Sequence, residues 1–190
     1  MNGAPPRRCR QLTTAGLALG LAIGVASAFV AGSGTASQTD AAVKAAFLFN
    51  FAKFAEWTAL APGAPIVVCI VGDDEVAAAL VAIVRGQTIG GRTVDTWRPV
   101  EVKTWRSCHI LYTTAAENRA GGGVSGLRTL PVLTVSDSKG FAQSGGIIEL
   151  YVEDERVRFA INVDALERSG LRLSSRLLGL AKVIRDPHVQ

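Results

Sequence analysis

Few side chains in this chain of 190 residues could carry out chemistry, because it has only two histidines and three cysteines. His188 lies in the polar C-terminal tail, and His109 directly follows Cys108. Neighbours on a regular strand point to opposite faces, so we do not expect Cys108 and His109 to form a nucleophile–base pair. The chain also has no Gly-x-Ser-x-Gly motif. The sequence therefore gives no support to covalent catalysis.

The sequence also lacks a recognisable motif for binding phosphate groups or metal ions. A dinucleotide-binding fold would carry glycines after the apolar run 66–71, but acidic residues occupy 73–75 and would repel a pyrophosphate. The glycines at 121–123 lack a following Gly-Lys-Ser/Thr, which favours a loop over a phosphate cradle. The acidic triplet Glu153, Asp154 and Glu155 is typical of a solvated hairpin tip. We predict neither a cofactor nor a metal ion.

Two positions stay open as ligand sites. Asp137 follows a predicted strand, at the edge where open α/β sheets bind ligands, although closing the turn through its side chain is the simpler role. The start of the last predicted helix could bind an anion through its free N–H groups. The side chains gathered there are Arg172, Ser174, Ser175 and Arg176. Ordinary capping also accounts for the serines.

Residues 1–36 have the layout of a secretory signal peptide. Three arginines within the first ten residues precede a long uncharged run of Leu, Ala, Val and Gly, which small residues close. The alternative is a permanent membrane anchor. Cleavage after Ala36 would leave residues 37–190, enough for a single domain with its own core.

The remaining domain would carry a formal charge of +1 instead of +4, because three arginines leave with the signal. It has no basic patch with interleaved aromatic residues, which argues against nucleic acid as a partner. It has no second long apolar stretch, so we expect no integral membrane segment after cleavage.

The cysteines that survive cleavage are an even pair. Cys9 would leave with the signal, while Cys69 and Cys108 remain. In an oxidising compartment such a pair favours a disulfide, which here would close a loop of about 39 residues. The alternative is two buried thiols in neighbouring strands.

Apolar periodicity predicts strands that alternate with helices, followed by a hairpin. We expect strands at 66–71, 92–97, 109–113, 132–135, 147–151 and 157–161. We expect helices at 40–57, 74–85, 163–169 and 174–184, and within 117–130 a helix that the glycines at 121–123 interrupt. This order predicts an α/β three-layer sandwich with a mixed, mostly parallel sheet flanked by helices, and an antiparallel hairpin at one edge.

Two of these helices have informative faces. In the helix 40–57 the apolar stripe is Val43, Phe47, Phe51 and Phe54, which leaves Phe49 on the opposite face. Phe49 is either half-buried packing or a contact with a partner. The last helix is expected to reach Ile184.

Five segments, in the right order along the chain, resemble the YfiR-like family of periplasmic regulators. They are VKAAFLFNFAKFAEW (43–57), VVCIVGDD (67–74), SCHILY (107–112), VLTVSDSKGFAQSGG (132–146) and RFAINVDALERSGLRLSSRLLGLAKV (158–183). Together they span nearly the whole of the domain 37–190.

The resemblance implies a periplasmic protein, commonly a homodimer and not an enzyme. It would bind the periplasmic sensory region of an inner-membrane diguanylate cyclase and repress it, which limits cyclic-di-GMP and biofilm formation. The family's strand cysteines match Cys69 and Cys108, so the resemblance assigns the disulfide to them. A second cysteine pair found in some members is missing here, and the family offers no catalytic residues.

The alternative function is a periplasmic small-ligand-binding module without a cyclase partner, using residues 172–176. A third possibility is a hydrolase, which would depend on His109 or Asp137.

Overall fold

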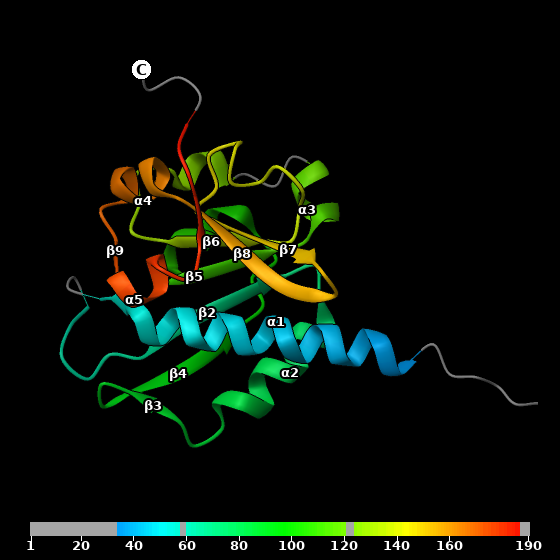
Figure 1. The fold of residues 1–190 in the computed structure, drawn as a ribbon. Helices are drawn as coiled ribbons and strands as arrows, with labels where there is room; N and C mark the ends of the chain where they lie inside the picture. Colours follow the sequence, from blue (N-terminus) through cyan, green and yellow to red (C-terminus); the bar gives the residue numbers. More distant parts are fainter. Residues whose placement is uncertain (1–33, 58–59, 121–123, 187–190) are drawn as a thin grey trace, which may run out of the picture. The chain divides into compact units, whose positions relative to one another are not determined.

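The computed structural model describes residues 34–57, 60–120 and 124–186 (Figure 1). The predicted signal, residues 1–36, lies almost entirely outside these ranges. Cys9, the glycines at 121–123 and His188 also lie outside them.

A mixed sheet organises the described part of the chain. Its eight strands follow the order β10-β8-β7-β6-β5-β2-β4-β3. The strands β4, β2, β5, β6 and β7 run parallel to one another, whereas β3 is antiparallel to β4 and β8 is antiparallel to β7. The strand bounds are β2 (Ile66–Val71), β3 (Thr88–Ile89), β4 (Arg92–Trp97), β5 (Ile110–Thr113), β6 (Leu133–Ser136), β7 (Ile148–Glu153), β8 (Arg156–Asn162) and β10 (Lys182–Ile184). The predicted α/β fold with a mixed, mostly parallel sheet is confirmed.

The predicted hairpin is formed by β7 and β8, with Glu153 opposite Arg156 across a two-residue turn. Asp154 and Glu155 in this turn have φ angles of 50° and 58°, as a tight hairpin turn requires. The hairpin lies at one end of the sheet, and the short strand β10 adds outside it, parallel to β8.

One face of the sheet is covered by the helices α1 (Gly34–Phe54) and α2 (Asp74–Val84), which pack against each other (Figure 1). Alternate strand residues such as Val68, Tyr112 and Val135 point into this larger core. The N-cap of α2 is Asp73, whose carboxylate accepts a hydrogen bond from the Val76 N–H at 2.9 Å.

The opposite face is covered by two short 3-10 helices, η1 (Val102–Ser107) and η2 (Val124–Leu127). Trp105 of η1 and Leu127 of η2 pack there against Cys69 and Leu111 of the strands. Both faces of the central strands are therefore buried, which explains their continuous apolar sequences.

The helix α1 ends earlier than predicted. Ala55 and Glu56 leave the helix as the strand β1 (Ala55–Glu56), which pairs with β9 (Arg172–Leu173) in a separate two-stranded antiparallel sheet. Trp57 is consequently not helical, and its indole N–H donates to the Ala52 carbonyl oxygen at 3.0 Å.

The prediction of a last helix reaching Ile184 is wrong. Helix α5 spans only Ser175–Leu178, and β10 follows it. The physical reason is the free edge of β8, whose backbone groups pair with residues 182–184. Asp164 fixes this arrangement, because its carboxylate accepts from the Arg185 guanidinium at 2.9 Å and from the Asp186 N–H at 2.7 Å.

The remaining helices are α3 (Ala115–Arg119) and α4 (Val163–Ser169). Asn162 caps α4 through the Ala165 N–H, and Gly170 ends it with a φ angle of 71°. None of the helices in the described ranges combines the length and apolar character needed to cross a membrane.

Candidate functional site

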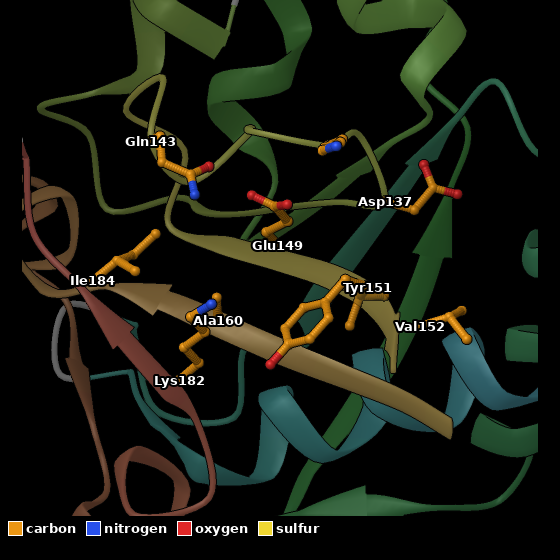
Figure 2. Close-up of a pocket in the computed structure, with 10 residues that line it drawn as sticks. Asp137, Gln143, Glu149, Tyr151, Val152, Ala160, Lys182 and Ile184 are labelled. Atoms are coloured by element: carbon orange, nitrogen blue, oxygen red, sulfur yellow. The ribbon is translucent and has the colours of Figure 1, made fainter. Parts of the chain in front are cut away.

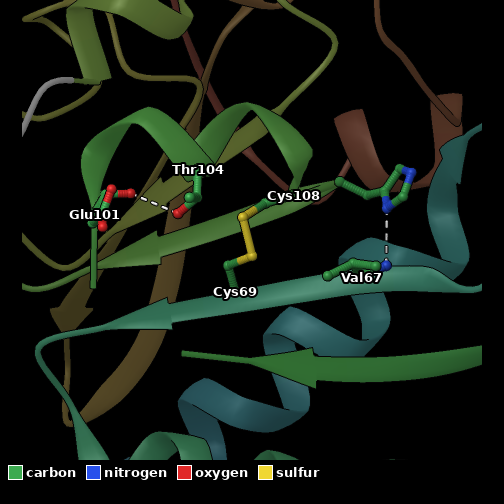
Figure 3. The surroundings of a disulfide bond; sticks show 6 residues. Val67, Cys69, Glu101, Thr104 and Cys108 are labelled. Atoms are coloured by element: carbon green, nitrogen blue, oxygen red, sulfur yellow. Dashed lines mark hydrogen bonds between the residues drawn. A yellow bond between two sulfur atoms is a disulfide. The ribbon is translucent and has the colours of Figure 1, made fainter. Parts of the chain in front are cut away.

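Cys69 of β2 and Cys108, which precedes β5, are joined by a disulfide bond (Figure 3). The strands β2 and β5 are parallel neighbours, which brings the two Cα atoms to 5.8 Å. Both cysteines are buried beside Trp105. The bond therefore ties the central strand to the segment that carries η1, within a buried apolar cluster.

His109 takes part in holding the same two strands together. Its Nδ1 atom accepts a hydrogen bond from the Val67 N–H at 2.9 Å (Figure 3), which requires an unprotonated Nδ1. Burial lowers the pKa of His109, and the positive charge of Arg92 lowers it further. With Cys108 in a disulfide and His109 bonded to the backbone, this pair has the geometry of a structural clamp.

A cavity of about 310 Å³ opens beside His109. Its walls include Trp57, Cys108 and Leu171, and the rings of Trp57 and His109 meet edge to face with centroids 5.7 Å apart. Cys108 thus lines a cavity although its own side chain is almost fully buried.

A polar cluster forms around Asp137, directly after β6. The Asp137 carboxylate accepts from the Lys44 ammonium at 2.8 Å, from the Tyr112 hydroxyl at 3.0 Å and from the Ala115 N–H at 3.2 Å. Lys44 also pairs with Asp40 one turn earlier in α1, at 2.7 Å. Asp137 therefore does more than close a turn, since it joins α1, β5 and α3.

The electrostatics of this cluster favour fixed protonation states. Burial alone would lower the pKa of Lys44, but its hydrogen bonds to Asp137 and Asp40 outweigh that effect and raise it. Burial, together with the negative charge of Asp137, raises the pKa of Tyr112. Lys44 stays charged and Tyr112 stays neutral at ordinary pH, so neither is poised as a general base.

A cavity of about 430 Å³ lies over β7, β8 and β10 (Figure 2). Tyr151, Ala160 and Ile184 contribute to its walls from these three strands. Asp137 is shared with a neighbouring cavity of about 230 Å³ that also contacts Lys44. The two hollows therefore flank the polar cluster.

The charges around the larger cavity are not balanced. The buried Glu149 carboxylate is occupied, because its two oxygens accept from the Gly140 and Ala142 N–H groups at 3.1 Å each. Lys139 and Lys182 line the same cavity and make no ion pair with any residue in the described ranges. The charge available to a ligand in this cavity is therefore positive.

The predicted anion site at residues 172–176 is spread over two elements. Arg172 belongs to β9, and Ser174 caps the four-residue helix α5 by accepting from the Leu177 N–H at 3.3 Å. Arg172, Ser175 and Arg176 are exposed. Ser174 thus has the capping role, and an anion site there stays a prediction.

Phe49, which the sequence places off the apolar stripe of α1, is buried. The helix is enclosed on several sides, so Ala45, Leu48 and Ala52 are buried as well as Phe51 of the predicted stripe. The ammonium group of Lys53 covers the Phe49 ring, 4.3 Å from its centroid. A contact between Phe49 and a partner stays a prediction, which the burial of the ring disfavours.

The acidic hairpin tip has the solvated character expected of it. Glu153, Asp154 and Glu155 are exposed, and Glu153 pairs with Arg158 across the hairpin at 3.4 Å. Within the described ranges no group of three or more metal-ligating side chains is close enough to hold an ion.

Sequence reasoning missed Lys44, Tyr112 and Glu149. Lys44 lies 93 residues from Asp137 along the chain, and periodicity carries no signal for such a pairing. Glu149 had one available signal, since it is an acidic residue inside an otherwise apolar strand, where a buried charge needs partners.

A protein-family model described as YfiR/HmsC-like matches residues 41–182 of the chain. The match covers the strands from β1 to β9, the disulfide, and the three residues Lys44, Tyr112 and Asp137. A search of curated proteins finds no match.

Proposed function

The chain belongs to the YfiR/HmsC-like family, and from this membership we propose that it is a periplasmic regulator that represses a membrane-anchored diguanylate cyclase. It is exported with the help of residues 1–36 and works as the folded domain 37–190. Its partner is the periplasmic sensory region of the cyclase, and its output is the level of cyclic-di-GMP and, through it, biofilm formation. The match over residues 41–182 is the observation that carries this proposal.

The chemistry of the described residues supports a binding role over catalysis. Cys108 is bonded to Cys69, His109 accepts a backbone N–H, and Asp137 is held by three donors. Each of the groups that a hydrolase would need is thus used to hold elements together. A protein of this kind acts through its surface.

Repression by binding has a defined energetic requirement. The regulator shifts the cyclase toward the inactive state only by the difference between its affinities for the two states of the sensory region. An affinity difference of about 100-fold would supply roughly 2.7 kcal/mol. The regulator acts as a homodimer, which presents two copies of one surface to a membrane partner.

Deletion of the gene is expected to raise cyclic-di-GMP, and expression of the full chain should restore the original level. The matched control is the chain without residues 2–36, expressed to the same level, which should fold but fail to restore repression. Unchanged cyclic-di-GMP after deletion, or rescue by the control, would contradict the proposal. Co-purification with membrane proteins under oxidising and reducing conditions would identify the partner and its dependence on the disulfide.

The cavity of about 430 Å³ favours a second candidate function, a periplasmic module that binds a small ligand. Its size lies within the range of small-molecule sites, and Lys139 and Lys182 would select an anion. A ligand-dependent rise in melting temperature that Lys139→Gln and Lys182→Gln both weaken, with no cyclase recovered in pull-downs, would favour this function.

A further inference from the structure

A single alanine makes room for the cavity of about 430 Å³ over β7, β8 and β10. Ala160 of β8 lies directly between Glu149 of β7 and Lys182 of β10, because these residues are its partners on the two neighbouring strands. Residues paired in this way point to the same face of a sheet. The small methyl group of Ala160, set between two long side chains, therefore forms the floor of a hollow.

The acid that shares this row with Lys182 is already occupied by other partners. Both oxygens of Glu149 accept backbone N–H groups, from Gly140 and Ala142 of the loop after β6, at 3.1 Å each. Lys182 forms no ion pair with any residue in the described ranges, and neither does Lys139 of the same loop. Two cations from different elements thus line the cavity without a counter-charge (Figure 2).

The charges that line the cavity leave one positive charge. Asp137 is neutralised by the Lys44 ammonium group at 2.8 Å. Lys44 also pairs with Asp40, but Asp40 does not line this cavity, and its side chain is 44 % exposed to screening by water. The remaining lining charges are those of Lys139, Lys182 and Glu149. Two positive charges and one negative charge are balanced by a ligand that carries a single negative charge.

The other walls of the cavity suit an apolar ligand body. Tyr151 lies two residues after Glu149 and points to the same face of β7 (Figure 2). Ile184 lies in the same way two residues after Lys182 on β10. A ligand with its charge between the lysines would therefore rest its body on Ala160 and against these two side chains. The volume of the cavity is within the range of small-molecule sites.

Strand β10, which supplies Lys182 and Ile184, is an edge strand with little buried surface. It has three residues, of which Lys182 and Val183 are exposed. Among the described residues its backbone pairs with β8 alone, and Asp164 anchors the residues that follow it. A strand of this kind opens more readily than a central one. A ligand that contacts both Lys182 and Lys139 would link β10 to the loop after β6 and so oppose this opening.

We propose that the cavity binds a small organic monocarboxylate, whose carboxylate lies between the ammonium groups of Lys139 and Lys182 and whose apolar body packs on Ala160 and Tyr151. Binding fastens β10 to the rest of the domain. The inference rests on the second candidate function, the module that binds a small ligand, and it names the class of that ligand and the element that the ligand holds. Because one domain builds the whole cavity, the proposal requires no cyclase.

The test is isothermal titration calorimetry of the purified protein, expressed as the full chain with its signal, with hexanoate and benzoate as probes. Hexanamide and benzamide are the matched ligand controls, since they keep the apolar body and remove the charge. We expect the carboxylates to bind and the amides to bind at least about tenfold more weakly, because hydrogen bonds to a charged group contribute that much. The affinity for the carboxylates should fall as the salt concentration rises.

Variants of the lining test where the ligand lies. Lys139→Gln and Lys182→Gln should each weaken binding about tenfold, and Ala160→Leu should abolish it by filling the floor of the cavity. Lys103→Gln is the matched control, because Lys103 is an exposed lysine outside the cavity, and it should bind as the natural protein does. Circular dichroism checks that each variant is folded. The two lysine variants decide the matter if Ala160→Leu does not fold.

Hydrogen exchange with and without hexanoate tests the effect on β10. The amides of residues 182–184 should exchange more slowly when the ligand is bound, whereas those of β4, at the far end of the sheet, should not change. Equal affinity for carboxylates and amides, undiminished binding in Lys182→Gln, or unchanged exchange in β10 would overturn the proposal.

Failure of either carboxylate to bind at millimolar concentration would overturn it as well. If a neutral ligand then raised the melting temperature, the small-ligand module would stand without this class of ligand. Cyclic-di-GMP plays no part in these measurements, so their failure is distinct from failure of the repressor function.

Discussion

Lys44 and Asp137 lie 93 residues apart in the chain, and their Nζ and Oδ2 atoms are 2.8 Å apart in the fold. The pair joins α1 to the end of β6, and Tyr112 donates to the same carboxylate oxygen. Only 15 % of the Lys44 side chain and 24 % of the Asp137 side chain are exposed. An ion pair with so little exposed surface has lost most of its hydration, so each charge depends on the other for its stabilisation.

Replacing Lys44 with methionine is expected to destabilise the protein by about 2 kcal/mol, because a sheltered carboxylate loses its counter-charge and one hydrogen bond. Urea unfolding of the natural and variant chains measures the difference. The control is Lys103→Met, which breaks the pair Lys103–Glu101, whose side chains are 77 % and 59 % exposed. That change should cost less than about 0.5 kcal/mol. Equal losses in the two variants would show that Lys44 has no special role.

Gly146 is expected to tolerate no side chain. A Cβ atom built on it would lie 2.1 Å from the Phe141 ring, which is itself buried. Gly146→Ala should therefore force the ring or the backbone to move, at a cost of about 1–3 kcal/mol. Gly126→Ala is the control, since a Cβ there meets nothing within 4 Å. Thermal unfolding compares the two, and a stable Gly146→Ala protein would contradict the packing seen here.

The disulfide should contribute a large share of the stability of the domain. Replacing Cys69 and Cys108 together by alanine is expected to lower the free energy of unfolding by about 4 kcal/mol in the chain-entropy description of a loop of this length. Denaturant unfolding with intact and reduced protein measures the same quantity in two ways. An unchanged unfolding midpoint in the double variant would show that the bond adds no stability.

Burial of both sulfurs gives a related expectation about the rate of reduction. Cys69 and Cys108 are at most 2 % exposed, so a reductant reaches the bond only after local opening. Dithiothreitol should therefore reduce the folded protein slowly, and mild urea should accelerate the reaction strongly. Thiol counting over time follows it. Immediate reduction without urea would mean that the layer around Trp105 opens freely.

Local signals explain the elements that the sequence predicted well. Asp73 caps α2, Gly170 ends α4 and the apolar run 66–71 forms β2, because each depends on neighbours within a few residues. The end of the chain was mispredicted for the opposite reason. Residues 182–184 have a pattern that also suits a helix, and only the free edge of β8 decides their conformation.

Some features of the candidate site were likewise predictable from the sequence, and others depend on tertiary packing. The Cys69–Cys108 pairing follows from composition and from the resemblance to a family, whereas the cluster of Lys44, Tyr112 and Asp137 depends on the packing of α1 across the sheet. A helical wheel assumes one buried face and so left two roles open for Phe49, whereas α1 is enclosed on several sides and buries this ring.

His109 is expected to make the stability of the domain depend on pH. Burial and the charge of Arg92 lower its pKa below 6.5 in the folded protein, so the unfolded chain takes up the proton more readily. The free energy of unfolding should therefore fall as the pH decreases through 6.5, and level off once the lowered pKa of the folded state is passed. Asp186, whose pKa is lowered from 3.8 mainly by a hydrogen bond from Asn162, titrates below this window.

The measurement is urea unfolding between pH 7.5 and pH 5 for the natural chain and for His109→Asn. Asparagine keeps an acceptor for the Val67 N–H but does not titrate, so the variant should lose the slope between these two pH values. His188→Asn, which changes the other histidine, serves as the control and should keep the slope. A slope that survives in His109→Asn, or a stability that rises as the pH falls, would mean that protonation of His109 does not oppose folding.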